Sequence, residues 1–146
     1  MLTIDTSVHV NAINATEASS SESQDFLSYV QAQQLIVFSP TLLRVELAAA
    51  VARSSGNLTK AVSFSQAISR QPNYRWIVLD EVLAQEAAYI GVAYRLKGAD
   101  AVYAAVAQRH GCTLVTLDQQ QLQRLACVIP VQEPGAALDT LRAARS

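Results

Sequence analysis

The chain has 146 residues, of which 51% are hydrophobic, and this size and composition predict one domain over residues 1–146. Its formal net charge of −1 shows no basic excess, so a polyanionic partner would have to be held by a local patch or through a bound cation. No basic leader precedes an apolar run, and no apolar stretch approaches the ~18 residues of a membrane helix, which predicts a cytoplasmic protein without membrane contact.

Short apolar runs rich in β-branched residues alternate with longer segments of helical composition. The runs predict strands at residues 2–4, 35–38, 76–79 and 113–117, and more weakly at 127–129. The longer segments predict helices at residues 22–33, 40–53, 58–70, 81–96, 99–110 and 135–144. Strands that alternate with helices require crossover connections, so the fold class is predicted to be α/β with a parallel sheet.

Two short stretches between these elements carry boundary signals. Ser39-Pro40 places a capping hydroxyl before a proline, which predicts that the second helix begins at Pro40. Residues Ala15 to Ser23 are rich in serine, which predicts a surface loop. Such a loop would lie near the residues that follow the first strand.

Two aspartates end predicted strands. Asp5 follows the strand at 2–4, and Asp118 follows the strand at 113–117. In an open parallel sheet, ligands bind at the carboxyl ends of the strands near the point where strand order reverses, so these two acids would face one crevice. The alternative is that each aspartate only caps a helix that starts just after it.

Two further acids lie on predicted helices. Glu46 interrupts an apolar stripe, because its neighbours three and four positions away are leucines and alanines. It could instead lie at the edge of that stripe or pair with Arg53. Asp100 begins an alanine-rich helix whose small side chains would allow close packing against the sheet. It could also cap that helix, although Tyr103 stands where a capping box would place Glu or Gln.

If the four acids converge, their mutual repulsion has to be offset. Two like charges ~4 Å apart repel by roughly 4 kcal/mol at an effective dielectric constant of about 20, and several such pairs would rival the stability of a small domain. Oxygen ligands without His or Cys favour Mg²⁺ or Mn²⁺ over zinc. His9 lies about a turn beyond Asp5, and His110 ends a helix where its ring could meet the terminal carbonyls, so neither is a good ligand candidate.

Four segments in a fixed order span nearly the whole chain, namely LTIDTS, SPTLLRVELAAAV, KGADAVYAAVAQRHG and TLVTLDQQ. With these segments the chain resembles the PIN domain family, the small metal-dependent ribonucleases that include the toxins of VapBC toxin-antitoxin systems. The resemblance implies a three-layer α/β/α fold around a central parallel sheet of about four or five strands.

The resemblance also implies a catalytic and metal-binding cluster made of four carboxylates: Asp5, Glu46, Asp100 and Asp118. Asp5 and Asp100 would be the principal magnesium ligands, and Thr6 or Thr116 would supply supporting hydroxyls. The chain departs from many relatives because no acid follows Asp100 within a helical turn and because glutamines follow Asp118. These departures leave open whether a second metal ion binds.

Together the residues and the resemblance predict hydrolysis of RNA phosphodiesters by a water that Mg²⁺, or Mn²⁺ as a substitute, activates. By resemblance, the partners would be the RNA substrate, a cognate antitoxin and a second copy in a homodimer, as in a type II toxin-antitoxin pair. Arg44, Arg95 and Lys97 are candidate RNA contacts, whereas the aromatic residues, Tyr103 among them, are expected to pack.

Two other functions are compatible with acids at strand ends. One is a PIN-like module that binds protein or RNA with little nuclease activity, and the four carboxylates argue against it without excluding it. The other is a receiver-like signalling domain that accepts phosphate on an aspartate. Asp5 has no adjacent acid and no lysine follows Lys97, and both features disfavour a receiver.

Overall fold

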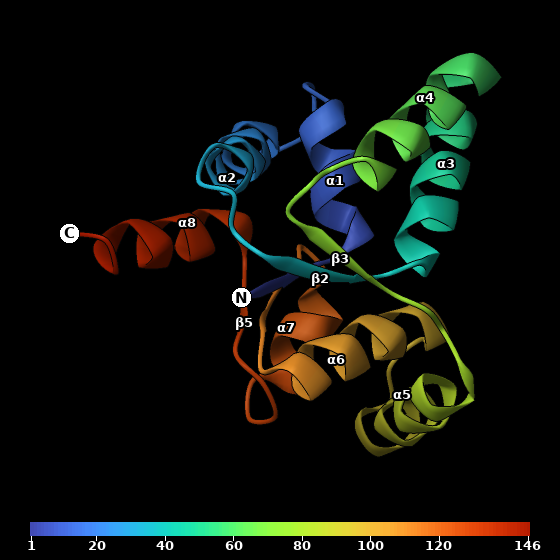
Figure 1. Ribbon diagram of the computed structural model, residues 1–146, viewed down its shortest axis with the longest axis vertical. Helices are drawn as coiled ribbons and strands as arrows, with labels where there is room; N and C mark the ends of the chain where they lie inside the picture. Colours follow the sequence, from blue (N-terminus) through green and yellow to red (C-terminus); the bar gives the residue numbers. More distant parts are fainter.

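A five-stranded parallel sheet forms the centre of the computed structural model, which describes residues 1–146 (Figure 1). Its strands are β1 (Leu2–Ile4), β2 (Val37–Pro40), β3 (Tyr74–Ile77), β4 (Thr113–Val115) and β5 (Val131–Gln132). Their order is β3-β2-β1-β4-β5, so the chain extends from β1 to one edge and then crosses to the other side. The strand order therefore reverses between β1 and β4, where ligands of such sheets bind.

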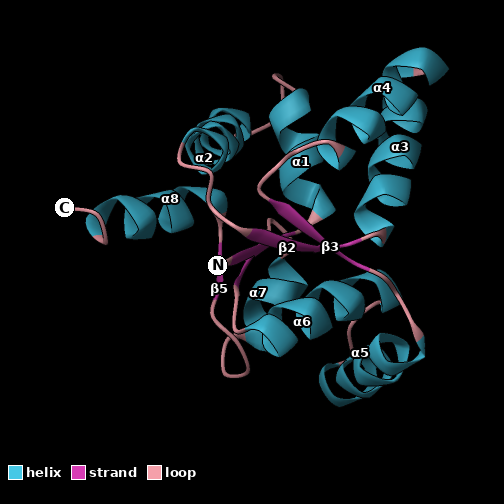
Figure 2. Ribbon diagram, in the orientation of Figure 1, coloured by secondary structure: helices cyan, strands magenta, loops and turns pink.

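Eight helices surround the sheet: α1 (Thr6–Ile13), α2 (Ser20–Ala32), α3 (Leu42–Ser55), α4 (Leu58–Ser69), α5 (Glu81–Tyr94), α6 (Gly98–His110), α7 (Gln119–Leu125) and α8 (Pro134–Ala143). Figure 2 shows α1 to α4 on one face and α5 to α7 on the other, and α8 packs against α2. The predicted three-layer α/β/α fold is confirmed. No helix combines the length and apolar character needed to cross a membrane.

Helix α6 is the most deeply buried helix. All seven residues from Ala101 to Ala107 are buried, whereas an ordinary surface helix buries one stripe. Four of these seven are alanines, and α6 contacts β1, β2 and β4, which confirms the predicted close packing. A Cβ on Gly91 of α5 would stand 3.4 Å from the Ala101 Cβ, so α5 approaches closely as well. This packing fixes the start of α6, where Asp100 lies, against the sheet.

The prediction that a helix begins at Pro40 is wrong. Ser39 and Pro40 belong to β2, where they pair with Trp76 and Ile77 of β3. The Thr41 N–H continues this ladder by donating to the Ile77 carbonyl, and α3 begins only after it. The pairing of extended backbone in the sheet therefore overrides the local capping signal of a serine followed by proline.

The weak fifth strand is displaced from its predicted position. The N–H groups of Val128 and Ile129 both donate to the Leu125 carbonyl, so residues 127–129 form the turn that ends α7. The chain reaches the sheet edge only after Pro130, where Val131 pairs with Leu114. The predicted loop at 15–23 is likewise too long, because α2 already begins at Ser20.

Candidate functional site

Asp5 ends β1 and caps α1 at the same time. Its N–H donates to the Val115 carbonyl of β4, which extends the sheet by one bond. Its Oδ2 accepts hydrogen bonds from the Ser7 N–H at 3.1 Å and from the Thr116 hydroxyl at 3.3 Å. The side chain is only 6% exposed. The capping role is therefore real, and it leaves Oδ1 without a hydrogen bond from the protein.

Asp118 follows β4 and caps α7 in the same way. Its Oδ1 accepts from the N–H groups of Gln120 at 2.8 Å and Gln121 at 3.1 Å. Its own N–H donates to the Thr116 hydroxyl oxygen at 3.0 Å. Because the Thr116 hydroxyl also donates to Asp5, this one side chain connects the two strand-end aspartates.

Ser7 is a site residue that the sequence did not reveal. Its hydroxyl oxygen accepts from the Leu117 N–H at 3.1 Å and lies 3.5 Å from the Thr116 hydroxyl. The first turn of α1 is thereby joined to the segment after β4. The only sequence signal was its position two residues after Asp5, where its backbone N–H can donate to a capping carboxylate. That bond does not depend on the side chain, so it did not indicate a serine hydroxyl in the site.

Glu46 turns from α3 toward two hydroxyl groups. Its Oε1 accepts from Thr6 at 2.9 Å and from Tyr103 at 2.8 Å, and the two hydroxyl oxygens are themselves 2.7 Å apart. Two hydroxyl hydrogens are thus shared among three short contacts. These contacts join Glu46 to Thr6 on α1 and to Tyr103 on α6. The alternative pairing with Arg53 is not observed. Burial, followed by the charge of Glu46, raises the pKa of Tyr103, so its hydroxyl stays protonated.

Tyr103 is fully buried, as the packing prediction required, but its hydroxyl also holds a candidate site residue. Its ring lies in the main apolar cluster, while its oxygen reaches Glu46 and Thr6. A buried tyrosine normally finds such a partner for its hydroxyl. The sequence predicted the packing of Tyr103 but gave no sign that its hydroxyl would contact Glu46.

Asp100 carries the clearest sign that the four acids act on one another. Its pKa is raised from 3.8 to about 6, first by burial, next by the charges of Asp5 and Asp118, and more weakly by Glu46. Lys97 acts in the opposite direction. The charges of all three other carboxylates therefore disfavour a charge on Asp100. We refer to Asp5, Glu46, Asp100 and Asp118 as the acidic cluster.

Asp100 does not cap α6, because Lys97 occupies the cap position and makes no side-chain capping bond. Instead, Asp100 Oδ1 accepts from the side-chain amide of Gln121 at 3.1 Å. Gln121 is fully buried, and its Oε1 has no hydrogen-bond partner. Its backbone N–H binds Asp118, so the first turn of α7 holds two members of the acidic cluster. From the sequence, Gln121 was only one of the glutamines that follow Asp118.

The acidic cluster suits a hard divalent cation by its chemistry. Every donor is a carboxylate oxygen, the kind of ligand that Mg²⁺ and Mn²⁺ prefer. Each carboxylate also keeps one oxygen free of hydrogen bonds from the protein, since the bonds above use Asp5 Oδ2, Glu46 Oε1, Asp100 Oδ1 and Asp118 Oδ1. No three His, Cys, Asp or Glu side chains form a ready-made ligand group. The metal role of these residues stays a prediction.

The basic candidates differ in their surroundings. The Arg44 guanidinium stacks over the Trp76 ring, 4.2 Å from its centroid, and its Nε is buried without a partner. Arg95 is exposed, and its carbonyl accepts from the Arg124 guanidinium. Lys97 is the one whose charge acts on Asp100. Lys97 is therefore the basic residue best placed to meet a polyanion beside the acidic cluster.

Neither histidine joins the acids. His110 stacks on Phe38 with ring centroids 4.2 Å apart, and its Nε2 is buried without a hydrogen bond. The prediction that the His110 ring contacts the terminal carbonyls of α6 is therefore wrong for Nε2, which donates to none of them. His9 is buried against Tyr74 of β3, with 3.4 Å between the Tyr74 hydroxyl and His9 Nε2.

Several solved structures share this fold. A toxin-antitoxin complex from Klebsiella pneumoniae has a TM-score of 0.67 and 18% identity, covering 92% of this chain and 98% of that chain. VapC20 of Mycobacterium tuberculosis, a sarcin-ricin loop cleaving toxin, has a TM-score of 0.70 and 19% identity over 88% and 96%. FitAcB from Neisseria gonorrhoeae has a TM-score of 0.68 and 22% identity over 92% and 98%.

Identities this low establish a common fold and no more. No curated protein matches the chain. The family model of the PIN domain, however, matches residues 2–126, which is most of the chain and includes all four members of the acidic cluster. The chain therefore belongs to the PIN domain family.

Proposed function

We propose that this protein is a magnesium-dependent endoribonuclease that hydrolyses RNA phosphodiesters. The observation that carries the proposal is the way hydrogen bonds bring the carboxylates together. Thr116 joins Asp5 to Asp118, and Gln121 contacts both Asp118 and Asp100. The charges of the other three acids accordingly raise the pKa of Asp100. Such repulsion at the carboxyl ends of β1 and β4 is what a divalent cation would relieve. Membership of the PIN domain family and the fold shared with an RNA-cleaving toxin support the same reaction.

Asp5 and Asp100 would hold the ion, and Glu46 and Asp118 would orient its waters or hold a second ion. When bound, Mg²⁺ would activate a water and offset the charge that develops on the phosphorus centre. It would also reverse the local sign of the potential, which allows a polyanion to approach an acidic pocket. Mn²⁺ is expected to substitute because it prefers the same oxygen ligands.

The residues around the acidic cluster would hold its carboxylates in place. Thr116 and the Ser7 N–H fix Asp5, and the Gln121 amide fixes Asp100. Tyr103 and Thr6 fix Glu46. Hydrogen bonds of this kind orient metal ligands and limit the side-chain entropy lost on binding. Lys97 would attract the RNA backbone beside Asp100.

The same proposal includes a role as the toxin of a type II toxin-antitoxin pair in the cytoplasm. Structures with this fold include several complexes of toxins with antitoxins. A groove of about 700 Å³ between α5 and α6, with ten hydrophobic residues among its twelve lining residues, supports an association with another chain. We expect a homodimer that binds a cognate antitoxin. Co-expression tests this role, because free accumulation of the chain without growth arrest contradicts a toxin.

Chelation and one substitution test the nuclease. Purified protein should cleave single-stranded RNA with Mg²⁺, lose this activity in EDTA, and regain it when Mg²⁺ or Mn²⁺ is restored. Asp5→Asn should abolish both cleavage and Mn²⁺ binding measured by calorimetry. Asp139→Asn, which changes an exposed acid on α8, is the matched control. Cleavage that survives EDTA overturns the metal role, and tight Mn²⁺ binding without cleavage points instead to a PIN-like binding module.

A further inference from the structure

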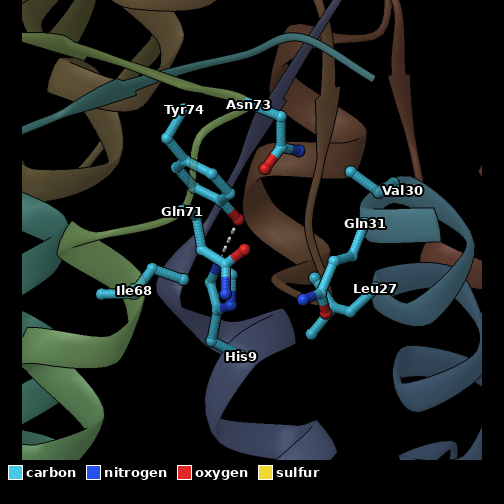
Figure 3. A pocket seen from close by; sticks show the side chains of 8 residues that line it. All are labelled: His9, Leu27, Val30, Gln31, Ile68, Gln71, Asn73 and Tyr74. Carbon is cyan, nitrogen blue, oxygen red and sulfur yellow. Dashed lines mark hydrogen bonds between the residues drawn. The ribbon is translucent and has the colours of Figure 1, made fainter. Parts of the chain in front are cut away.

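A second recess lies on the face of the sheet that α1 to α4 cover, at the start of β3. Its volume is about 160 Å³, and Figure 3 shows side chains converging on it from α1, α2, the end of α4 and the start of β3. No member of the acidic cluster lines it. The recess is therefore separate from the site proposed above, and we call it the neutral cavity.

Asn73 presents an unpaired acceptor to this cavity. The side chain is 4% exposed, and its Nδ2 donates to the Leu35 carbonyl at 2.8 Å, which fixes the orientation of the amide. Its Oδ1 is buried without a hydrogen-bond partner and points into the space among the side chains drawn in Figure 3. A buried carbonyl oxygen without a partner is unfavourable, so a donor from a ligand would stabilise it.

The polar groups of the neutral cavity carry no charge at neutral pH. Burial lowers the pKa of His9 to about 4 and raises the pKa of Tyr74, so both side chains are neutral. Their polar atoms face each other at 3.4 Å (Figure 3). The remaining polar lining residues are amides, and no Asp, Glu, Lys or Arg lines the cavity. A charged ligand would lose its hydration without gaining an ion pair, so the cavity selects a neutral one.

The walls and the size define the shape of that ligand. Leu27, Val30 and Ile68 supply apolar surface, while the exposed Gln31 and the half-buried Gln71 add side-chain amides. An engineered cavity of ~150 Å³ in another protein takes up benzene, so this volume suits one flat ring system. Apolar walls, a buried acceptor and two side-chain amides together match a ring that carries both donors and acceptors.

We propose that the neutral cavity binds an uncharged nucleobase, with an N–H group of the base donating to Asn73 Oδ1. The base could arrive as a free nucleoside or as one nucleotide of an RNA chain. Either source offers the same planar ring with adjacent donors and acceptors. The proposal does not depend on the nuclease activity, because no residue of the acidic cluster takes part.

The test is a titration of the metal-free protein with adenosine, guanosine, cytidine and uridine, followed by NMR. At least one nucleoside should bind with 1:1 stoichiometry and shift the side-chain amide resonance of Asn73. A short single-stranded RNA forms the second arm, with EDTA present to prevent cleavage. Binding by nucleosides alone identifies a free ligand, and tighter binding by RNA identifies a subsite for one nucleotide of a longer chain.

Gln71→Phe supplies the decisive variant, because Gln71 is only half-buried at the cavity mouth and a larger ring there would fill the space. We expect affinity to fall by about tenfold or more, whereas Gln108→Phe, at an exposed site on α6, should stay within about twofold. Tyr74→Phe keeps the ring and provides a milder second variant. The proposal is overturned if no nucleoside or RNA shifts the Asn73 amide, as a cavity filled only by water requires, or if Gln71→Phe binds as tightly as the wild type.

Discussion

The acidic cluster and the neutral cavity both use α1, yet different interactions shift the pKa values of their titratable groups. Burial and neighbouring charges raise the pKa of Asp100 to about 6, whereas burial alone lowers that of His9 to about 4, and each shift favours the uncharged form. Three neighbouring carboxylates add to the shift of Asp100, whereas no charged group acts on His9. The repulsion within the acidic cluster thus favours the binding of a cation. The neutral cavity, in contrast, disfavours any charged group.

The largest expected effect is a loss of RNA cleavage that follows changes in the acidic cluster alone. Asp100→Asn removes one proposed metal ligand, so RNA cleavage should fall by more than about 100-fold, because losing even an outer partner of a ligand costs ~10–100-fold. The measurement is the initial rate of cleavage with saturating Mg²⁺. Asp25→Asn, an exposed acid on α2, should cleave at the wild-type rate. An Asp100→Asn enzyme of normal activity would remove Asp100 from the site.

The next effect tests the neutral cavity through pH. Because the folded pKa of His9 lies below its unfolded value of 6.5, the stability that its neutral form contributes is present above pH 6.5 and is lost as the pH falls through about 4. The loss should reach about 3 kcal/mol in the free energy of unfolding. Urea unfolding at pH 7 and pH 4, with EDTA present, measures it.

A His9→Gln variant should show a pH dependence that is smaller by this amount, because glutamine does not titrate. The Asp100 contribution is common to both proteins and cancels in the comparison. Should the variant fold poorly, an NMR titration of the His9 ring in the wild type gives the pKa directly. A ring that titrates near 6.5 would contradict the neutral character assigned to the cavity.

A smaller effect is expected from the support of the acidic cluster. Gln121→Leu removes the amide that holds Asp100 while filling similar space, and it also removes the unpaired Oε1. Mn²⁺ affinity and cleavage should therefore fall by ~10–100-fold with little change in the melting temperature. Gln120→Leu is the control, since Gln120 is exposed and gives Asp118 only its backbone N–H. Unchanged Mn²⁺ affinity would show that Gln121 only packs.

The sequence sufficed for the framework of the acidic cluster because its signals are local. Asp5 and Asp118 follow apolar runs directly, and Glu46 interrupts a stripe that would otherwise be apolar. Parallel topology then places strand ends at one edge. The observed capping of α1 and α7 does not exclude the site prediction, because a carboxylate can cap a helix with one oxygen and keep the other free.

The groups that hold these acids were beyond sequence reasoning. Tyr103 meets Thr6 across 97 positions, and Ser7 meets the Leu117 N–H across 110, so neither contact leaves a local pattern. The neutral cavity depends in the same way on side chains from four separate elements. The fifth strand was misplaced because it has two residues, too few for a periodic signal, while an apolar turn lies just before it.

The smallest expected effect is a gain in stability when Asp100, a proposed site residue, is replaced. The folded pKa of Asp100 lies above its unfolded value, so its contribution to stability is fully present below about pH 4 and is lost as the pH rises through about 6. In metal-free protein at pH 7, Asp100→Asn should therefore be more stable by about 1 kcal/mol, a value reduced by solvent screening of a half-exposed group.

Thermal unfolding in EDTA at pH 7 and pH 4.5 measures this difference, which should shrink at the lower pH as the wild-type carboxyl gains its proton. Adding Mg²⁺ should reverse the order at pH 7, because a ligand that binds only the folded wild type stabilises it by about 2.7 kcal/mol at 100 times its Kd. A variant that is less stable than the wild type in EDTA would mean that the Gln121 hydrogen bond outweighs the repulsion from Asp5, Asp118 and Glu46. The acidic cluster would then be stable without a cation, and the contrast with the neutral cavity would disappear.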